Sequence, residues 1–445
     1  MRILYCHNYY RHRGGEDVSF ELDVQRLRSA GHDVEVFTRD NHELRGGPLG
    51  TAARSLFNRA TAAAIRERLT EFRPDVLHCN NLFPQITPSV CSVAAKLGVP
   101  VVMALRNYRS FCANTFFFRD GKVCTKCLGL PAAVHGIRHR CYRDSVSASA
   151  VVAAIQTHRR VARVDRWIDA YVTPSEFSRT LHVENGYPAS KVFVRPNYIH
   201  PDLGAESPQQ AVRQNSGAVF VGRLSKEKGV DTLIDAWQRH ELDISLTIIG
   251  GGPETDSVRE AAASDPRITM TGSLPTNEVL AHLAAAECLI MPSRWFETFG
   301  RTIAEAFSRG TPAIVSDLGA MAELVDPACG WKFPAGDAEA LADRVHRLRG
   351  QSETERAAMR SAARARYESR FSWEQSYRRL LRCYRQVFEN RGIDLLPVEE
   401  AESAMRFEHE PHDGSGGRHR HDQSLVTSDV AARSLESDDL GRGTR

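Results

Sequence analysis

The stretch MPSRWFETFGRTIAEAF, residues 291–307, runs from an apolar strand through a loop into an amphipathic helix. This strand–loop–helix order is the repeating unit of parallel α/β folds. Two glutamates, Glu297 and Glu305, stand eight positions apart, one before the helix and one inside it. The free amides at a helix start suit phosphate oxygens, and flanking carboxylates can accept hydrogen bonds from hydroxyl groups. The stretch therefore indicates a ligand with both groups, although a capping residue and a surface charge are the simpler interpretation.

The same alternation of strand and helix extends along most of the chain. It predicts an α/β protein with parallel sheets and crossover helices, built as two doubly wound, Rossmann-like domains that face each other across a cleft. Helical patterns such as residues 18–31 separate the strands. The expected strands are 2–7, 33–38, 75–80, 100–105 and 168–173 in the first half, and 217–223, 244–250, 267–272, 287–293 and 311–317 in the second.

Composition changes mark the domain boundaries. We expect a first domain over 1–198, and a linker rich in Pro, Gly, Ser and Gln follows at 197–217. The second domain is expected over 215–370, and a helix bearing Trp and Tyr, 371–393, should cross back to the first domain. Residues 398–445 lose the apolar pattern and are rich in Gly and His, which predicts disorder.

The chain of 445 residues has ordinary composition, with 42% hydrophobic and 25% charged residues. It contains no apolar run long enough for a membrane span, and its first ten residues look like a strand rather than a signal peptide. We therefore expect a cytoplasmic protein.

The charge is distributed unevenly along the chain. Residues 1–200 carry 28 Lys/Arg against 17 Asp/Glu, whereas the remaining residues carry 30 Lys/Arg against 38 Asp/Glu. The basic half can face a membrane surface or an anionic acceptor, or be simply solvated; no nucleic acid partner is expected.

Two further strand ends carry features that suit a ligand. Strand 217–223 ends at Gly222 and is followed by Arg223 and Lys228, which supply positive charge for a diphosphate. The segment LTIIGGGPE, 246–254, runs from a strand into a glycine-rich turn. Its glycines allow close approach of a ligand, but a tight strand-to-helix turn explains them equally well.

Together these features resemble the retaining glycosyltransferases of family four, which have the GT-B fold of two facing Rossmann-like domains. The resemblance covers residues 1 to about 390. It implies that Glu297 contacts the donor sugar and Glu305 the ribose of a nucleoside diphosphate sugar. Arg223 and Lys228 would neutralise the diphosphate. The other donor-binding positions it implies are Gly222, the amides around Phe299, Gly300 and Arg301, and the Gly14–Gly15 loop between donor and acceptor.

The resemblance also implies an activity. A sugar would pass, with retention at the anomeric carbon, to a hydroxyl on a glycan or lipid-linked acceptor, in the synthesis of a cell-surface polysaccharide or glycolipid. No catalytic metal is expected, because Arg223, Lys228 and helix amides stabilise the leaving group. A catalytically lapsed nucleotide-sugar-binding subunit and a GT-B nucleotide-sugar epimerase are the alternatives.

One position departs from the family pattern. Many members have a histidine after the fourth strand, and Arg106 stands at that place in ALRNYRSFC, 104–112. Arginine stays protonated and cannot act as a base, but it can hold donor or acceptor, so Arg106 is kept among the candidate catalytic residues. His78 lies near another strand end, and a core histidine is its simpler role.

An insert at 106–145 carries four cysteines, Cys112, Cys124, Cys127 and Cys141, spaced C-x11-C-x2-C-x13-C. Four thiolates can close a tetrahedral zinc site, which would be structural because no coordination position stays open. We favour such a zinc site, with unligated thiols or a redox pair as alternatives; the spacings fit no standard iron–sulfur pattern. A subset of bacterial family-four sequences resembles this insert.

Overall fold

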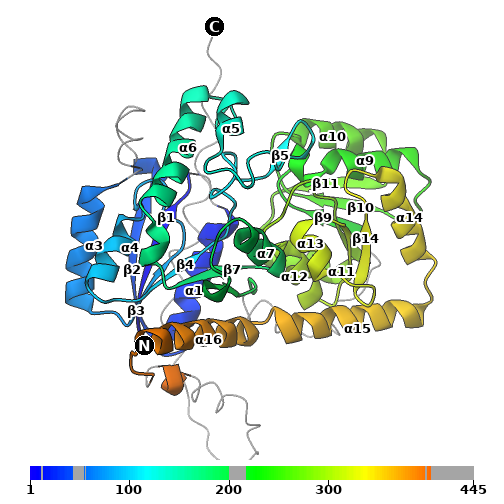
Figure 1. The fold of residues 1–445 in the computed structure, drawn as a ribbon. Helices are drawn as coiled ribbons and strands as arrows, with labels where there is room; N and C mark the ends of the chain where they lie inside the picture. Colours follow the sequence, from blue (N-terminus) through cyan, green and yellow to red (C-terminus); the bar gives the residue numbers. More distant parts are fainter. Residues whose placement is uncertain (12–13, 44–54, 56, 200–216, 396–397, 402–445) are drawn as a thin grey trace, which may run out of the picture. The chain divides into compact units, whose positions relative to one another are not determined.

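The computed structural model describes residues 1–11, 14–43, 55, 57–199, 217–395 and 398–401. Residues Met1–Ser403 form one compact unit. Within it lie two six-stranded parallel sheets, each covered by helices (Figure 1). The α/β class and the two Rossmann-like sheets predicted from the sequence are confirmed.

The first sheet has the strand order β2-β1-β3-β4-β7-β8. Its central strands are buried on both faces, as parallel strands covered by helices must be. The strands are β1 (Arg2–Tyr9), β2 (Asp33–Asp40), β3 (Val76–Cys79), β4 (Val101–Ala104), β7 (Ala170–Thr173) and β8 (Val192–Val194), and the helices of this domain include α1 (Gly15–Ser29), α3 (Arg59–Phe72), α4 (Ser89–Lys96), α6 (Val146–Val161) and α7 (Glu176–Glu184).

The second sheet has the order β11-β10-β9-β12-β13-β14. One apolar cluster fills each side of it, centred on Phe307 and on Trp237. Its strands are β9 (Ala218–Val221), β10 (Leu246–Ile249), β11 (Ile268–Gly272), β12 (Cys288–Met291), β13 (Ala313–Ser316) and β14 (Gly330–Phe333), and its helices include α9 (Val230–Arg239), α10 (Thr255–Ser264), α11 (Thr276–Ala285), α12 (Arg301–Ser308), α13 (Gly319–Leu324) and α14 (Ala338–Arg349).

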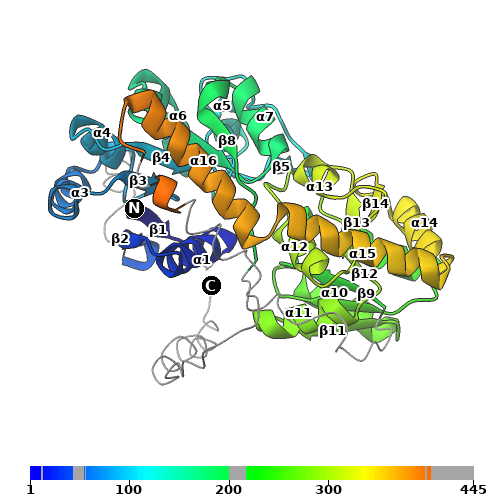
Figure 2. The same cartoon turned by 90° about the horizontal axis from the view of Figure 1, so that it is seen from below.

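Two long helices, α15 (Glu353–Arg370) and α16 (Trp373–Arg391), follow the second sheet. Serine side chains, Ser352 and Ser372, cap their N-termini. Helix α15 packs on α12, whereas α16 is bonded to the first domain: Tyr377 lies 2.5 Å from His32 and Tyr384 lies 2.7 Å from His78. Figure 2 shows the two helices following one another.

The insert between β4 and α6 has little regular structure. A two-stranded antiparallel hairpin joins β5 (Phe118–Arg119) to β6 (Lys122–Val123), and a short helix, α5 (Val134–Arg138), follows. Four 3₁₀ turns complete the described elements: η1 (Asn41–Glu43), η2 (Val164–Trp167), η3 (Ala189–Lys191) and η4 (Lys226–Lys228).

The sequence patterns located ten of the parallel strands, and the sheet-edge strands β8 and β14 were not expected. Most of the expected linker, 200–216, lies outside the described residues. So does most of the segment expected to be disordered, but residues 398–401 form a helical turn in which Val398 is fully buried. Across the described residues, no helix combines the length and apolarity that crossing a bilayer requires.

Candidate active site

Glu297 lies in the loop between β12 and α12 and is 6% exposed. Its Oε1 accepts three hydrogen bonds: from Lys228 Nζ at 2.6 Å, Ser293 Oγ at 2.9 Å and Trp295 Nε1 at 2.9 Å. In the described part of the chain no donor is bonded to its Oε2. One carboxylate oxygen is thus fixed by protein donors, and the other is the one available to a ligand hydroxyl.

The two cations of the second domain each face a carboxylate. Lys228 pairs with Glu297, and Arg223 pairs with Glu227 at 2.6 Å. Arg223 is half-exposed, and Glu227 is held from the other side by Ser225 Oγ at 2.7 Å. Burial alone would raise the pKa of Glu227, but its bonds to Ser225 and the charge of Arg223 outweigh burial and lower the pKa. Glu227 and Glu297 therefore hold the two cations next to the loop after β9.

The N-terminus of α12 begins beside Glu297. Gly300 caps it with φ of +98°, a backbone conformation in which only glycine is unstrained. Phe299 is 2% exposed and packs into the core, so it contributes through its backbone rather than its ring. Arg301 donates to Glu305 Oε1 at 2.9 Å, one helical turn later. Glu305 therefore has a protein partner where a ribose hydroxyl was expected to bind.

The glycine-rich turn after β10 has a structural explanation. A Cβ on Gly250 would lie 1.9 Å from Gly222 O, and one on Gly252 would lie 2.4 Å from Leu224 O. These two glycines let the turn pack against the backbone that carries Gly222 and Arg223. A tight turn therefore explains the glycines of this segment. By packing there, the turn helps to position the loop that carries Arg223.

The turn between β1 and α1 carries Gly14 and Gly15. A Cβ at either position would meet no atom of the described residues within 4 Å, so their packing does not require glycine there. Asp17 holds the turn: its carboxylate accepts from Gly14 N at 3.0 Å and pairs with His7 Nε2 at 2.8 Å. A carboxylate only accepts, so His7 Nε2 carries the hydrogen. The open space beside both glycines is what a closely approaching ligand would need.

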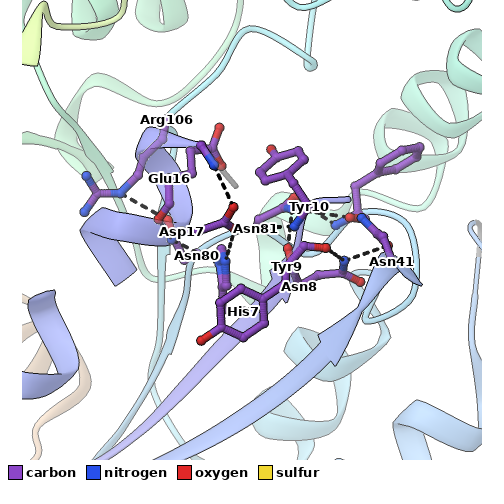
Figure 3. Close-up of polar contacts among 12 residues, drawn as sticks. His7, Asn8, Tyr9, Tyr10, Glu16, Asp17, Asn41, Asn80, Asn81 and Arg106 are labelled. Atoms are coloured by element: carbon purple, nitrogen blue, oxygen red, sulfur yellow. Dashed lines mark hydrogen bonds and ion pairs between the residues drawn. The ribbon is translucent and has the colours of Figure 1, made fainter. Parts of the chain in front are cut away.

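Arg106 belongs to a buried polar network at the carboxyl end of β4 (Figure 3). Its guanidinium donates to Asn80 Oδ1 at 3.1 Å, to Asp23 at 3.1 Å and to Asn197. Asp23 also accepts two hydrogen bonds from Arg195, at 2.7 and 2.9 Å. Burial would raise the pKa of Asp23, but the two guanidinium charges hold it below its usual value. The observed partners of Arg106 are therefore protein side chains, of which Asn80 and Asp23 are buried.

His78 lies in the same core region. Its Nδ1 is 2.7 Å from Tyr384 OH, and its ring stacks on Tyr5 at 4.5 Å. Burial lowers the pKa of His78 to about 3, so it is neutral at physiological pH. These contacts favour the core role over a catalytic one.

The insert contacts the loop that carries Glu297. Tyr108 OH donates to the Glu297 carbonyl oxygen at 3.3 Å, and the Phe116 ring meets the Trp295 ring edge-on at 5.0 Å. Arg294 donates to the carbonyl of Gly121 in the β5–β6 turn. Because Trp295 itself donates to Glu297, the insert supports the candidate catalytic carboxylate from outside its own domain.

The four cysteines line one small cavity of about 20 Å³, together with His135 and His139. All four are free thiols. Burial raises the pKa of Cys112 to about 11, and burial and neighbouring sulfurs also raise the pKa values of Cys127 and Cys141. Among the described residues, however, no three His, Cys, Asp or Glu side chains are arranged to hold one ion. The structure gathers the four thiols predicted as zinc ligands around one cavity.

The structure thus groups the candidate residues into two sets. One set lies at one end of the second sheet: Glu297, Lys228, Arg223, Glu305 and the α12 N-terminus. The other set, Arg106 and the Gly14–Gly15 turn, belongs to the first domain.

Sequence patterns did not reveal the supporting residues that donate hydrogen bonds to Glu297 and Asp23. Ser293 and Trp295 lie within the stretch that revealed Glu297, but nothing in their spacing marks them as its partners. Arg195 follows the short strand β8, which was itself unpredicted.

Two family models match this chain. Residues 14–198 match the model of the glycosyl transferase 4-like domain, and residues 215–351 match that of the glycosyl transferases group 1. Together the two matches span well over half of the chain.

Solved structures share the fold. HepE of Anabaena, determined with UDP and glucose, has a TM-score of 0.56 at 20% identity. The match covers 87% of this chain and 98% of that protein. A glycosyltransferase from Rickettsia africae ESF-5 has a TM-score of 0.62 at 15% identity, with 87% and 99% covered.

Curated relatives match over part of their length. The phosphatidyl-myo-inositol mannosyltransferase of Mycobacterium leprae is 31% identical over 200 residues, 43% of this chain and 53% of that protein. The 2-deoxystreptamine glucosyltransferase of Streptomyces kanamyceticus is 30% identical over 233 residues, covering 46% and 57%. The matches thus span about half the length of these relatives. The family models and the fold agree, and the chain belongs to the family 4 glycosyltransferases with the GT-B fold.

Proposed function

We propose that the protein transfers a sugar from a nucleoside diphosphate sugar to a hydroxyl group of a glycan or lipid-linked acceptor, with retention of anomeric configuration. The names of relatives support the reaction class, since they include a mannosyltransferase, a glucosyltransferase and a protein solved with UDP and glucose. The second domain binds the donor, and the first binds the acceptor.

The observation that carries this proposal is the position of Lys228 against Glu297. A cation suited to a diphosphate and a carboxylate suited to a sugar hydroxyl lie 2.6 Å apart at the start of a helix. A nucleoside diphosphate sugar presents these two groups next to each other. Glu305, inside the same helix, lies where the ribose of that donor would be bound.

The chemistry follows from the groups at hand. The bond from the anomeric carbon to the diphosphate oxygen breaks, and a bond to the acceptor oxygen forms on the same face of the sugar. The acceptor proton passes to the departing phosphate oxygen, so no protein base is needed. Lys228, Arg223 and the α12 amides stabilise the charge that develops on the diphosphate. Arg106 orients the acceptor side of the site rather than moving a proton.

A structural zinc ion bound by Cys112, Cys124, Cys127 and Cys141 is part of the proposal. Thiolate ligands suit zinc, and an ion there would fix the insert that supports Glu297. The common cavity of the four thiols supports this assignment.

A panel of nucleoside diphosphate sugars tests the function. Each is incubated with the wild-type protein and with Glu297→Gln, and released nucleoside diphosphate is measured without an acceptor. Slow release from one donor, lost in the variant, is expected. A lapsed subunit would bind a donor without releasing nucleotide, an epimerase would release an isomerised nucleotide sugar, and failure to bind any donor would refute the assignment.

A further inference from the structure

A cavity of about 600 Å³ lies in the first domain beside helix α6. One face of α6 lines it, because Val152, Ile155, Gln156, Arg159 and Arg160 recur at helical spacings of three and four. The opposite wall comes from the end of β4 and the loop that follows it. The cavity also reaches Glu16, the residue next to the Gly14–Gly15 turn, so it adjoins the proposed reaction site.

The lining is both cationic and apolar. Among the described residues that line it are six arginines and two carboxylates, Glu16 and Asp165. Each carboxylate is already engaged: Glu16 accepts from Asn107 at 2.7 Å, and Asp165 accepts from Tyr171 OH. The arginines are Arg106, Arg109, Arg159, Arg160, Arg163 and Arg166, and the apolar residues between them include Leu82, Phe83, Met103, Leu105, Phe111 and Ile155.

Two of these arginines make no direct ion pair among the described residues. In the described part of the chain, neither Arg109 nor Arg159 forms an ion pair with an acidic side chain. Arg109 stacks on Phe83 at 4.4 Å, and its buried Nε has no hydrogen-bond partner. Arg159 donates to the Met103 sulfur at 3.7 Å, and the charge of Asp165 reaches it without direct contact. Partly buried cations that no carboxylate contacts directly are costly, so the cavity is suited to an anion.

The position of Arg109 links the two sides of the cavity. Its carbonyl accepts from Gln156 Nε2 on α6 at 2.6 Å, and its backbone amide donates to Asn107 Oδ1 at 3.0 Å. Asn107 in turn donates to Glu16 beside the glycine turn. An anionic group bound at Arg109 would therefore lie between the Gly14–Gly15 turn on one side and the apolar walls around Met103 and Ile155 on the other.

We propose that this cavity binds the acceptor, and that the acceptor carries a phosphate or diphosphate joined to an apolar chain. This inference rests on the proposed function, because it assigns the acceptor class to the same site. The anionic group is bound by Arg109 and Arg159, and the chain lies against the apolar walls. A small sugar phosphate would satisfy the arginines but leave this apolar surface in contact with water, which is unfavourable.

Equilibrium binding of three probes tests the inference: farnesyl diphosphate, inorganic diphosphate and farnesol. The variants are Arg109→Gln, Arg159→Gln and Arg160→Gln. Arg160 is exposed, so its variant is expected to fold whatever happens to the other two. Arg259→Gln, an exposed arginine on α10, is the matched control, and Lys228→Gln reports binding of a diphosphate at the donor site.

Farnesyl diphosphate is expected to bind the wild-type protein at least tenfold more tightly than either other probe. Arg109→Gln and Arg159→Gln should weaken it at least tenfold, and Arg160→Gln at least threefold, with Arg259→Gln and Lys228→Gln unchanged. If inorganic diphosphate bound as tightly as farnesyl diphosphate, the apolar walls would not contribute to binding. If Lys228→Gln lost farnesyl diphosphate binding and the cavity variants kept it, the probe would bind at the donor site and the proposed cavity site would be wrong.

Donor hydrolysis keeps the two proposals separate. Farnesyl diphosphate binding in a protein that releases no nucleoside diphosphate from any donor would refute the transferase and retain the cavity as a site for an anionic amphiphile. Donor hydrolysis by a protein that does not bind farnesyl diphosphate would retain the transferase and refute this acceptor class.

Discussion

Lys228 Nζ lies 2.6 Å from Glu297 Oε1, so the proposed diphosphate cation and the proposed sugar-binding carboxylate neutralise each other. Each has the other as its partner before a ligand arrives. A bound diphosphate would give Lys228 a second anion, and a sugar hydroxyl would give Glu297 a second donor. The pair thereby holds both side chains near the geometry that a donor needs, at little cost in side-chain entropy.

Glu297→Gln should keep donor binding and impair turnover. Glutamine keeps the shape of the side chain but removes the charge next to the sugar, so nucleoside diphosphate affinity should stay within about threefold of wild type. Turnover should fall at least tenfold, since charge-assisted hydrogen bonds contribute about 1.5–3 kcal/mol. Binding is measured by calorimetry and turnover by nucleotide release. A variant with wild-type turnover would remove Glu297 from the site.

Glu305→Ala should weaken nucleotide binding. The ribose hydroxyls lose a charged acceptor, which corresponds to about 1.5–3 kcal/mol, or roughly 10- to 150-fold in the dissociation constant. Glu368→Ala is the matched control, because Glu368 forms the same kind of pair one turn from Arg364 on an exposed helix face. If both variants bound nucleotide equally well, Glu305 would be only the partner of Arg301.

Gly15→Ala separates folding from function at the glycine turn. A Cβ there meets no atom of the described residues within 4 Å, and alanine favours helix over glycine by up to about 1 kcal/mol. The thermal midpoint should therefore stay the same or rise, whereas donor hydrolysis should fall at least tenfold if a ligand fills that space.

The contrasting variant is Gly250→Ala, whose Cβ would lie 1.9 Å from a backbone oxygen. That variant should be destabilised. Full activity in Gly15→Ala would show that the ligand does not approach this turn.

Local patterns predicted what depends on neighbours in sequence. The strands, the α12 start and the Glu297–Glu305 spacing all follow from residues within about fifteen positions of one another. Contacts between distant segments could not be predicted. Tyr108 reaches Glu297 across 189 positions, and Arg195 reaches Asp23 across 172. Arg106 shows the consequence: its sequence position suggested substrate contact, but its three side-chain partners are distant in sequence and could not be predicted.

Metal analysis tests the insert. If the proposal is right, purified protein should contain about one zinc ion per chain. Cys124→Ser combined with Cys127→Ser should release it, lower the thermal midpoint and reduce donor hydrolysis, because the insert supports the loop of Glu297 through Tyr108 and Phe116. Cys329→Ser is the control, since Cys329 lies in the second domain. Metal-free protein with four titratable thiols and full stability would exclude the site.

Stability should decrease between pH 6.5 and pH 4 because of buried histidines. Burial lowers the pKa of His182 and of His32 to about 4, and that of His78 to about 3, whereas unfolded histidine titrates near 6.5. Above pH 6.5 both states are neutral and these residues have no effect. Below it the unfolded state binds more protons, so each histidine costs about 1.4 kcal/mol of stability per pH unit until its folded pKa is reached.

Urea unfolding of the His182→Phe variant tests this. Its free energy of unfolding should depend less steeply on pH, by about that slope, and the variant His346→Gln at an exposed site should follow wild type. Parallel curves for wild type and His182→Phe would show that His182 is not neutral in the folded protein.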